Sequence, residues 1–188
     1  IGAALSENYI GFDLSGATSA VTASDATRPV AGRTWAVIED ATVTSTGAAS
    51  QVLATAGQTI NALVISGAGS VAVGGVGLAA AGAGVGARNW INADTAARLS
   101  GGLDVAVDSL VVQATNAARI EAGAGAIAFS VSGGLAGLSL AIAASEADNR
   151  ILSTTTAEIV AGGATTGSVT ARTGGVTVDA RDDAHIAA

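Results

Sequence analysis

The sequence repeats itself with a period of 60 residues, and this constrains the fold more than any other feature. Shifting the chain by 60 positions superposes identical residues along most of its length. Examples are Val52 with Val112, Ile60 with Ile120, Ser70 with Ser130, Leu78 with Leu138, Asn89 with Asn149, Ile91 with Ile151 and Thr95 with Thr155. A shift of 66 carries Val112 and Ile120 onto Val178 and Ile186. Repetition at a fixed period indicates a stacked, quasi-linear architecture.

The matches divide residues 1–188 into one repetitive segment without a second domain. We assign a partial repeat to 1–42, full repeats to 43–102 and 103–168, and a partial repeat to 169–188. Because both ends fall inside partial repeats, we expect the chain to be a piece of a longer polypeptide. Thr22–Arg33 repeats least and is predicted to project as a loop, and the extra residues of the later repeat fall near Thr165–Ser168.

Composition limits both the core and the partners. Apolar residues make up 49% of the chain but aromatic residues only 3%, so the core must consist of Val, Ile, Leu and Ala. Cysteine is absent, which excludes disulfides, thiolate metal sites and thiol nucleophiles. The net charge of −7, with eight arginines and no lysine, argues against binding to nucleic acid or to an anionic membrane.

Two long stretches carry no charge, and their secondary structure has to be decided. Ala62–Ala87 and Ala122–Ala144 are long enough to be membrane-spanning helices. Their dense glycine disfavours helix, and apolar residues alternate with a period of two at Ile127, Phe129 and Val131. The alternation predicts β-strands and no membrane insertion.

Short apolar runs between turn residues predict strands elsewhere as well. Val176–Val178 is one such run, and Gly101-Gly102 and Gly174-Gly175 are predicted turns. We therefore predict an all-β fold, a parallel β-solenoid in which each 60-residue repeat forms about three coils of about 20 residues. Roughly nine coils spaced by about 4.8 Å would give a rod about 45 Å long.

The uncharged stretches also suggest an interaction surface. Exposed sheet surfaces normally carry charge that prevents association. We therefore expect one uncharged flank to pack against another copy or a neighbouring chain, and we expect Ala81→Asp and Ala141→Asp to abolish that association.

Candidate catalytic and metal-binding residues are few. His185, the only histidine, occupies the position of Arg119 and Thr59 in the earlier copies and is predicted to be an outward strand residue. Asp179, Asp182 and Asp183 offer oxygen ligands for calcium, but they do not recur between copies, so a solvated turn is preferred.

Other motifs have structural interpretations. Asp104 and Asp108 are spaced as same-face strand neighbours but are not repeated, which leaves a glycoside-cleaving cleft without support. The glycine run 82–86 lacks the spacing of a phosphate-binding loop. Asn8, Asn89 and Asn149 recur, and we expect them to form turns; at three coils apart they would be too distant for a continuous ladder. No catalytic, cofactor-binding or metal-binding residue is assigned.

The repeats resemble a known class of sequence. Gly174–Ala180 followed by Ala184–Ala188, and Asn89–Ile91 followed by Thr95–Leu99, are similar to the "beta strand repeat" units of very large bacterial surface and secreted proteins. Regions of filamentous haemagglutinin-like and autotransporter passenger proteins are similar too. The resemblance implies a right-handed parallel β-helix, export to the cell surface or beyond, and a stalk, adhesin or matrix role. It carries over no catalytic residue.

Together these features predict a non-enzymatic, structural or adhesive segment of a bacterial extracellular protein, acting as a stalk or self-assembling fibre without a cofactor. The expected partners are further copies or neighbouring repeats of the same polypeptide, and a host or matrix surface. The alternative is a carbohydrate-binding or carbohydrate-processing β-helix. It would require aromatic or carboxylate clusters that stack across coils, and Tyr9, Trp35 and Trp90 are far apart in the sequence.

Overall fold

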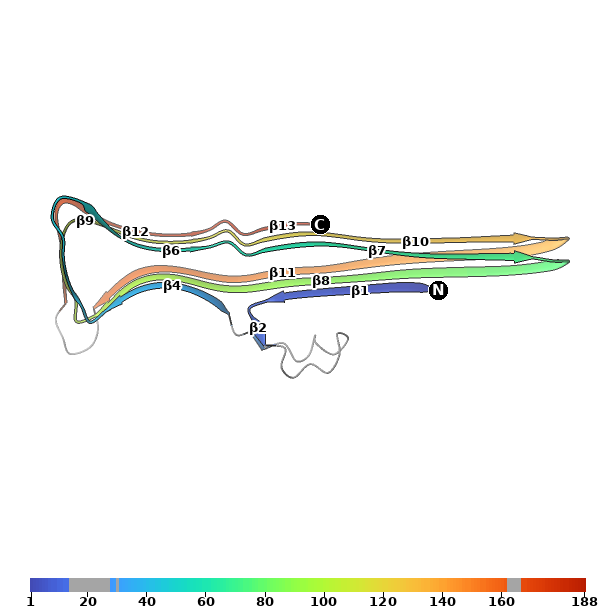
Figure 1. The fold of residues 1–188 in the computed structure, drawn as a ribbon, viewed down its shortest axis with the longest axis horizontal. Helices are drawn as coiled ribbons and strands as arrows, with labels where there is room; N and C mark the ends of the chain where they lie inside the picture. Colours follow the sequence, from blue (N-terminus) through green and yellow to red (C-terminus); the bar gives the residue numbers. More distant parts are fainter. Residues whose placement is uncertain (14–27, 30, 162–166) are drawn as a thin grey trace.

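The computed structural model describes residues 1–13, 28–29, 31–161 and 167–188, and over these ranges its regular elements are all β-strands. The molecule is long and flat, and most strands run along its long axis (Figure 1). The strands are β1 (Gly2–Ile10), β2 (Phe12–Asp13), β3 (Arg28–Pro29), β4 (Gly32–Glu39), β5 (Thr42–Thr44), β6 (Ala49–Ala56), β7 (Thr59–Val73), β8 (Val76–Gly101), β9 (Asp104–Asn116), β10 (Arg119–Gly133), β11 (Ala136–Ala161), β12 (Ser168–Asp182) and β13 (His185–Ala187). The predicted all-β class is confirmed.

Three parallel sheets contain all the described strands except β2 and β3. In the first, β8 lies between β11 on one side and β1 and β4 on the other. In the second, β10 lies between β7 and β13. In the third, β9 lies between β12 and the pair β5 and β6. Only β2 and β3 pair antiparallel among the strands that the structure describes.

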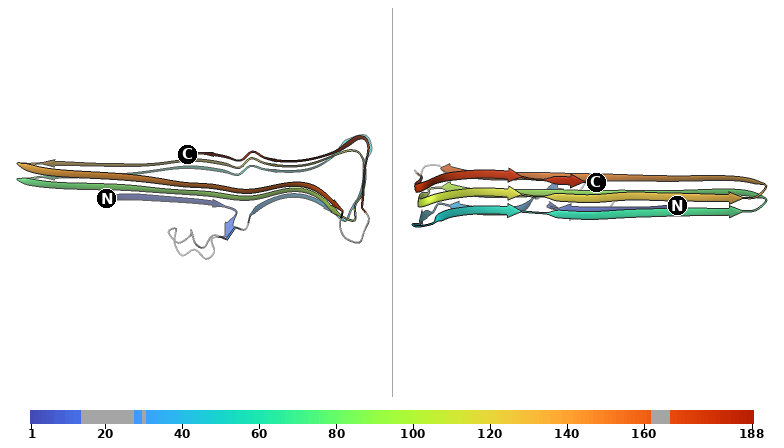
Figure 2. Two further views of the ribbon diagram at one scale, coloured as in Figure 1. Left: turned by 180° about the vertical axis from the view of Figure 1, so that it is seen from behind. Right: turned by 90° about the horizontal axis from the view of Figure 1, so that it is seen from above.

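Residues 60 apart in the sequence are direct neighbours across the sheets. Ile60 pairs with Ile120 and Asn89 pairs with Asn149. The offset of 66 also appears, since Ile120 pairs with Ile186. Each repeat is therefore one layer that passes once through all three sheets, and Figure 2 shows the layers side by side. The prediction of three coils per repeat is wrong, because hydrogen-bonded neighbours leave no room for intervening coils.

This correction changes the expected shape. Along the stacking axis, three layers spaced by about 4.8 Å give a much shorter dimension than the nine coils predicted from the sequence. The long dimension instead follows the strands, since the 26 residues of β8 extend roughly 85 Å at about 3.3 Å per residue.

The uncharged stretches are strands, as predicted, but longer ones than the turn signals suggested. β7 and β8 cover 62–87 apart from the turn at Gly74-Gly75, and β10 and β11 cover 122–144 apart from Gly134-Leu135. Glycine does not interrupt these strands, because each residue is held by the ladder to the next layer. Among the described residues, no helix is both long and apolar enough to cross a membrane.

The interior changes character along the strands. Near the bend at β9 it is filled by large side chains such as Leu99, Val107 and Val112, all fully buried. Around the two glycine turns, in residues 61–82 and 121–142, the inward positions of β7 and β10 carry mostly alanine and serine, with Val64. We call these two ranges the distal half; they form the end of the molecule opposite the β9 bend (Figure 1).

The predicted loop at 22–33 lies largely outside the described residues. Its described part includes Arg28–Pro29, which pairs with Phe12–Asp13, and the beginning of β4. The predicted insertion at 165–168 is described only from Gly167 onwards.

Candidate functional site: inter-layer ladders and two apolar faces

Acidic and histidine side chains do not gather into a metal site in the described parts of the chain. No group of three or more that would suit a metal ion occurs among those residues. His185 is an exposed residue of β13, in register with Arg119, as the repeat alignment predicts. Among the hydrogen bonds of the described residues, none joins the His185 imidazole to an acidic side chain that could orient it.

The acidic residues near the end of the chain contact different partners. Asp179 accepts a hydrogen bond from Gln113 in the neighbouring layer at 3.1 Å. Asp183 pairs with Arg181 at 3.4 Å. Asp179 and Asp182 both belong to β12, so the predicted solvated turn is confined to the connection after Asp182.

Asp182 is the most extensively hydrogen-bonded carboxylate of the described chain. It accepts hydrogen bonds from Ser153 Oγ at 2.6 Å, Thr155 Oγ1 at 3.1 Å, Asn116 Nδ2 at 3.3 Å and the Ala184 amide at 3.2 Å. Burial raises the pKa of this carboxyl, but the four donors outweigh it and hold the pKa below its usual value. The ionised form thus links two sheets and two layers.

Asp104 and Asp108, noted in the sequence as same-face neighbours, also connect layers. Asp104 accepts a hydrogen bond from Ser168 Oγ at 3.0 Å. Asp108 accepts one from the Gly47 amide at 2.5 Å and one from Arg172 Nε at 3.1 Å, so it joins all three layers. The Gly47 amide first, and Arg172 second, hold the pKa of Asp108 below its usual range.

The three repeated asparagines form a continuous ladder. Asn8 Nδ2 donates to Asn89 Oδ1 at 2.7 Å, and Asn89 Nδ2 donates to Asn149 Oδ1 at 2.8 Å. All three lie within strands, and Asn89 is fully buried. The predicted turn role is wrong, and so is the prediction that no ladder forms, because both rested on three coils per repeat.

Charged side chains are matched across layers in the same way. Glu7, Arg88 and Asp148 occupy equivalent positions in successive layers, with N–O distances of 3.2 Å and 3.4 Å. Arg98 pairs with Glu158 at 2.5 Å, again at an offset of 60. Opposite charges directly across a ladder stabilise pairing and penalise other registers.

One aromatic cluster forms across two layers. Tyr9 and Trp90 are register partners with ring centroids 5.7 Å apart, and Phe12 lies 5.9 Å from Tyr9. Arg88 and Arg150 lie over the Trp90 ring at 5.5 Å and 5.8 Å. Tyr9 and Trp90 thus meet although the sequence separates them widely. Trp35 lies elsewhere: the Arg33 guanidinium lies over its ring, and its Nε1 donates to Asp94 at 3.1 Å.

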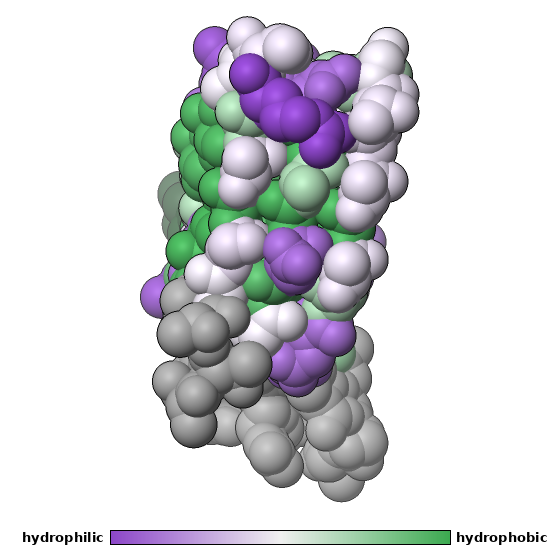
Figure 3. Space-filling view, turned by 90° about the vertical axis from the view of Figure 1, so that its left-hand side faces the viewer, coloured by the Kyte–Doolittle hydropathy of each residue, from purple (hydrophilic) through white to green (hydrophobic). Residues whose placement is uncertain are grey.

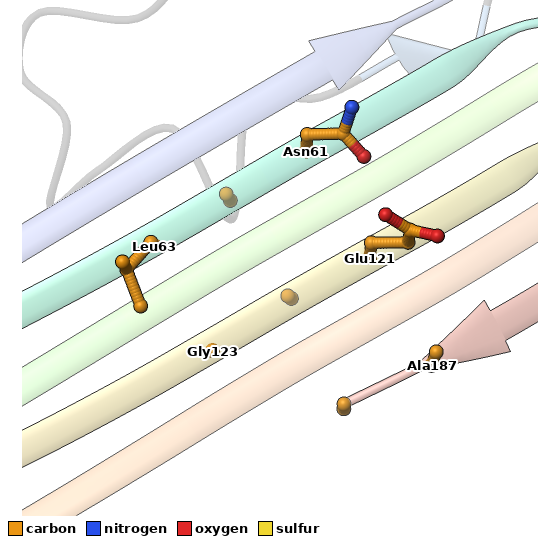
Figure 4. Close-up of a pocket in the computed structure, with 8 residues that line it drawn as sticks. Asn61, Leu63, Glu121, Gly123 and Ala187 are labelled. Atoms are coloured by element: carbon orange, nitrogen blue, oxygen red, sulfur yellow. The ribbon is translucent and has the colours of Figure 1, made fainter.

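Two parts of the surface offer little chemistry. A shallow groove lies along β7, β10 and β13 (Figure 4), and its only polar side chains are Asn61 and Glu121. At the β9 end of the molecule, hydrophilic residues alternate with hydrophobic and neutral ones (Figure 3). Neither surface presents a nucleophile beside a base.

The distal half carries its large apolar side chains outward. On β7 and β10 they form what we call the β7 face: Leu63, Ile65, Val71, Val73, Ile127, Phe129 and Val131. On β8 and β11 they form the β8 face: Val76, Leu78, Leu138, Leu140 and Ile142. Each of these side chains is 56–86% exposed.

Several large outward residues have a glycine as their register partner in the neighbouring layer. Ile127 pairs with Gly67, Phe129 with Gly69, and Ile142 with Gly82. The Phe129 ring lies over Gly69, in the space that a Cβ atom at that glycine would occupy. On the β7 face, Leu63 lies against Gly123 in the same way, so both side chains cover part of the neighbouring layer.

The residues predicted to carry association are not on these faces. Ala81 is 6% exposed and points between the sheets, because it shares the parity of Ala79 and Ala83, whereas its register partner Ala141 is exposed on β11. Ala81→Asp would bury a charge instead of altering a surface. Sequence alternation shows which residues share a face, but it does not show which face is inside.

Comparison with family models, with curated proteins and with solved structures found no match for this chain. The site therefore has to be interpreted from its own geometry.

Proposed function

We propose that this chain is a structural repeat segment of a large bacterial extracellular protein, in which successive layers stack as a right-handed parallel β-helix. In this role it acts as a stalk or a self-assembling fibre at the cell surface or beyond, and not as an enzyme. The observation that carries the proposal is the 60-residue register, which places matched side chains of successive repeats in contact. Such matching serves to add one layer to the next.

A chain with one additional copy of residues 43–102 tests this proposal. We expect the stack to thicken by about 4.8 Å while the length along the strands stays unchanged, which small-angle X-ray scattering distinguishes. We also expect a higher midpoint of urea unfolding, because each layer adds a stabilising interface. An extra copy that behaves as an independent body, or that lengthens the molecule along the strands, would contradict stacking.

A carbohydrate-binding role is the second candidate, and the aromatic cluster favours it. Trp90, Tyr9 and two arginines converge across the layers, which gathers aromatic surface and hydrogen-bond donors at one place. A glycan array tests it with the intact chain and with Trp90→Ala. Binding that disappears in Trp90→Ala supports this role, and the matched change Trp35→Ala should leave the binding unchanged. An intact chain that binds no glycan rejects it.

A further inference from the structure

The distal half has the reverse of the usual arrangement of a water-soluble sheet. Large apolar side chains normally face the interior, and small or polar ones face water. Here Ala79 and Ala81 are buried while Leu78 is 71% exposed. Because the same inversion occurs on β7 and β10, it belongs to both sides of the molecule.

The two apolar faces are too large to be incidental. Isolated exposed hydrophobic residues are common, but contiguous patches above a few hundred Å² mark interaction surfaces. The seven side chains of the β7 face contribute roughly 100 Å² each, or roughly 700 Å² in all. A standard interface buries about 800 Å² on each partner.

Lipid does not suit these faces, although they are apolar. β7 pairs only with β10, and β11 pairs only with β8, among the described strands. In the isolated chain, which is the form tested below, their outer edges present unpaired backbone N–H and C=O groups that hydrocarbon cannot satisfy. A protein partner that covers a face leaves both edges in water.

Charge indicates how a protein partner would lie. The chain has a net charge of −7, yet no charged residue occurs between Asp40 and Arg88 or between Glu121 and Glu146. A parallel arrangement of two copies would bring their charged halves together as well, whereas bends at opposite ends join the uncharged segments alone. In the opposed arrangement the acidic ends are separated by far more than the screening length of about 8 Å.

We propose that the β7 and β8 faces are docking surfaces for a second copy of this chain, with overlapping distal halves and β9 bends at opposite ends. This inference rests on the proposed structural role and deepens it by naming the contact between copies. Each face docks on the same face of another copy, and because the two faces lie on opposite sides, association continues from copy to copy and does not close at a dimer.

Sedimentation velocity of the intact chain and of face variants tests the proposal. Ile65→Asp with Phe129→Asp alters the β7 face, and Leu78→Asp with Leu140→Asp alters the β8 face. Leu53→Asp with Val37→Asp is the matched control, since both residues are exposed apolar strand residues outside the distal half, 48% and 45% exposed. Threonine at the same positions provides milder variants that keep strand propensity.

We expect the intact chain and the control to form a concentration-dependent series beyond the dimer. Each single-face variant should stop at the dimer, and the variant altered on both faces should be a monomer with the same far-UV circular dichroism. The threonine variants should rank in the same order as the aspartate variants, with smaller decreases in sedimentation coefficient.

Three results would overturn the proposal. The first is an intact chain that stays monomeric at every concentration. The second is a control that loses association as much as the face variants do. The third is flotation of the chain with neutral phosphatidylcholine vesicles that is lost in the variant altered on both faces, which would make lipid the occupant. The tandem-copy experiment is independent of all three, so stacking and lateral pairing can fail separately.

Discussion

Asn89 shows how a buried polar side chain is accommodated between layers. It is fully buried, donates to Asn149 and accepts from Asn8. A buried amide costs free energy unless it is hydrogen-bonded, and the identical residue in each neighbouring layer provides the partner. The ladder therefore favours the observed register over any shifted one.

We expect Asn89→Ala to lower the free energy of unfolding by about 2 kcal/mol, because it leaves an amide group unpaired on each side. Urea unfolding followed by circular dichroism measures this change. The control is Asn61→Ala, an exposed residue of β7, which should change stability by less than about 0.5 kcal/mol. Equal effects of the two variants would mean that the ladder contributes nothing.

Asp182 predicts a loss of stability in acid. Its pKa is lower in the folded chain than the ordinary value of about 3.9, so its ionised form stabilises the fold above that pH. This contribution disappears as the pH falls through the lowered pKa, because the unfolded chain takes up the proton first. We expect Asp182→Asn to reduce the loss of unfolding free energy between neutral and acidic pH.

A second variant identifies the cause of this pH dependence. Ser153→Ala removes the closest donor to the carboxylate, which raises the folded-state pKa of Asp182 toward its unfolded value and should make the acid loss of stability smaller. If acid unfolding of both variants follows that of the unaltered chain, Asp182 is not the group that titrates.

At the scale of the element, the turn between β10 and β11 depends on glycine. Gly134 has φ of 142°, and a Cβ atom there would overlap the Gly74 carbonyl oxygen of the neighbouring layer. Both the conformation and the close approach exclude a side chain.

We expect Gly134→Ala to destabilise the fold by about 2 kcal/mol, within the range for strained backbone positions. Gly125→Ala is the matched control, because Gly125 lies within β10 and a Cβ there meets open space. The control should be neutral or slightly stabilising. Thermal unfolding of the two variants measures the difference, and equal midpoints would contradict a strained turn.

The elements also show what sequence patterns can predict. The period-two alternation at Ile127, Phe129 and Val131 correctly predicts a strand, because alternation reflects the two faces of a sheet. The repeat alignment correctly predicts which residues are equivalent. Neither pattern gives the number of coils in a repeat, and therefore neither predicts that the repeated asparagines are direct neighbours. The assignment of inside and outside in the distal half requires the packing of Ala79 and Ala81, which sequence alone does not provide.

At the scale of the whole molecule, matched contacts concentrate between layers. Glu7–Arg88–Asp148, the asparagine ladder and Asp108 all cross layer boundaries. Exposed ion pairs contribute little individually, but each one disfavours a shifted register. Contacts between neighbouring layers therefore determine the register of each added layer. The β7 and β8 faces contribute no such polar contact.

The one-layer repeat has a mechanical consequence. A load that pulls the two ends apart along the stacking axis acts across the strands, so the ladder hydrogen bonds break one after another instead of together. Each layer that peels away removes about 4.8 Å of thickness and releases roughly 200 Å of extended chain. Force spectroscopy of tandem copies should show increments near that length, whereas separate 20-residue coils would give a third of it. Under tension the segment would then act as an extensible tether, in which each layer that unfolds becomes roughly forty times longer than its thickness in the stack.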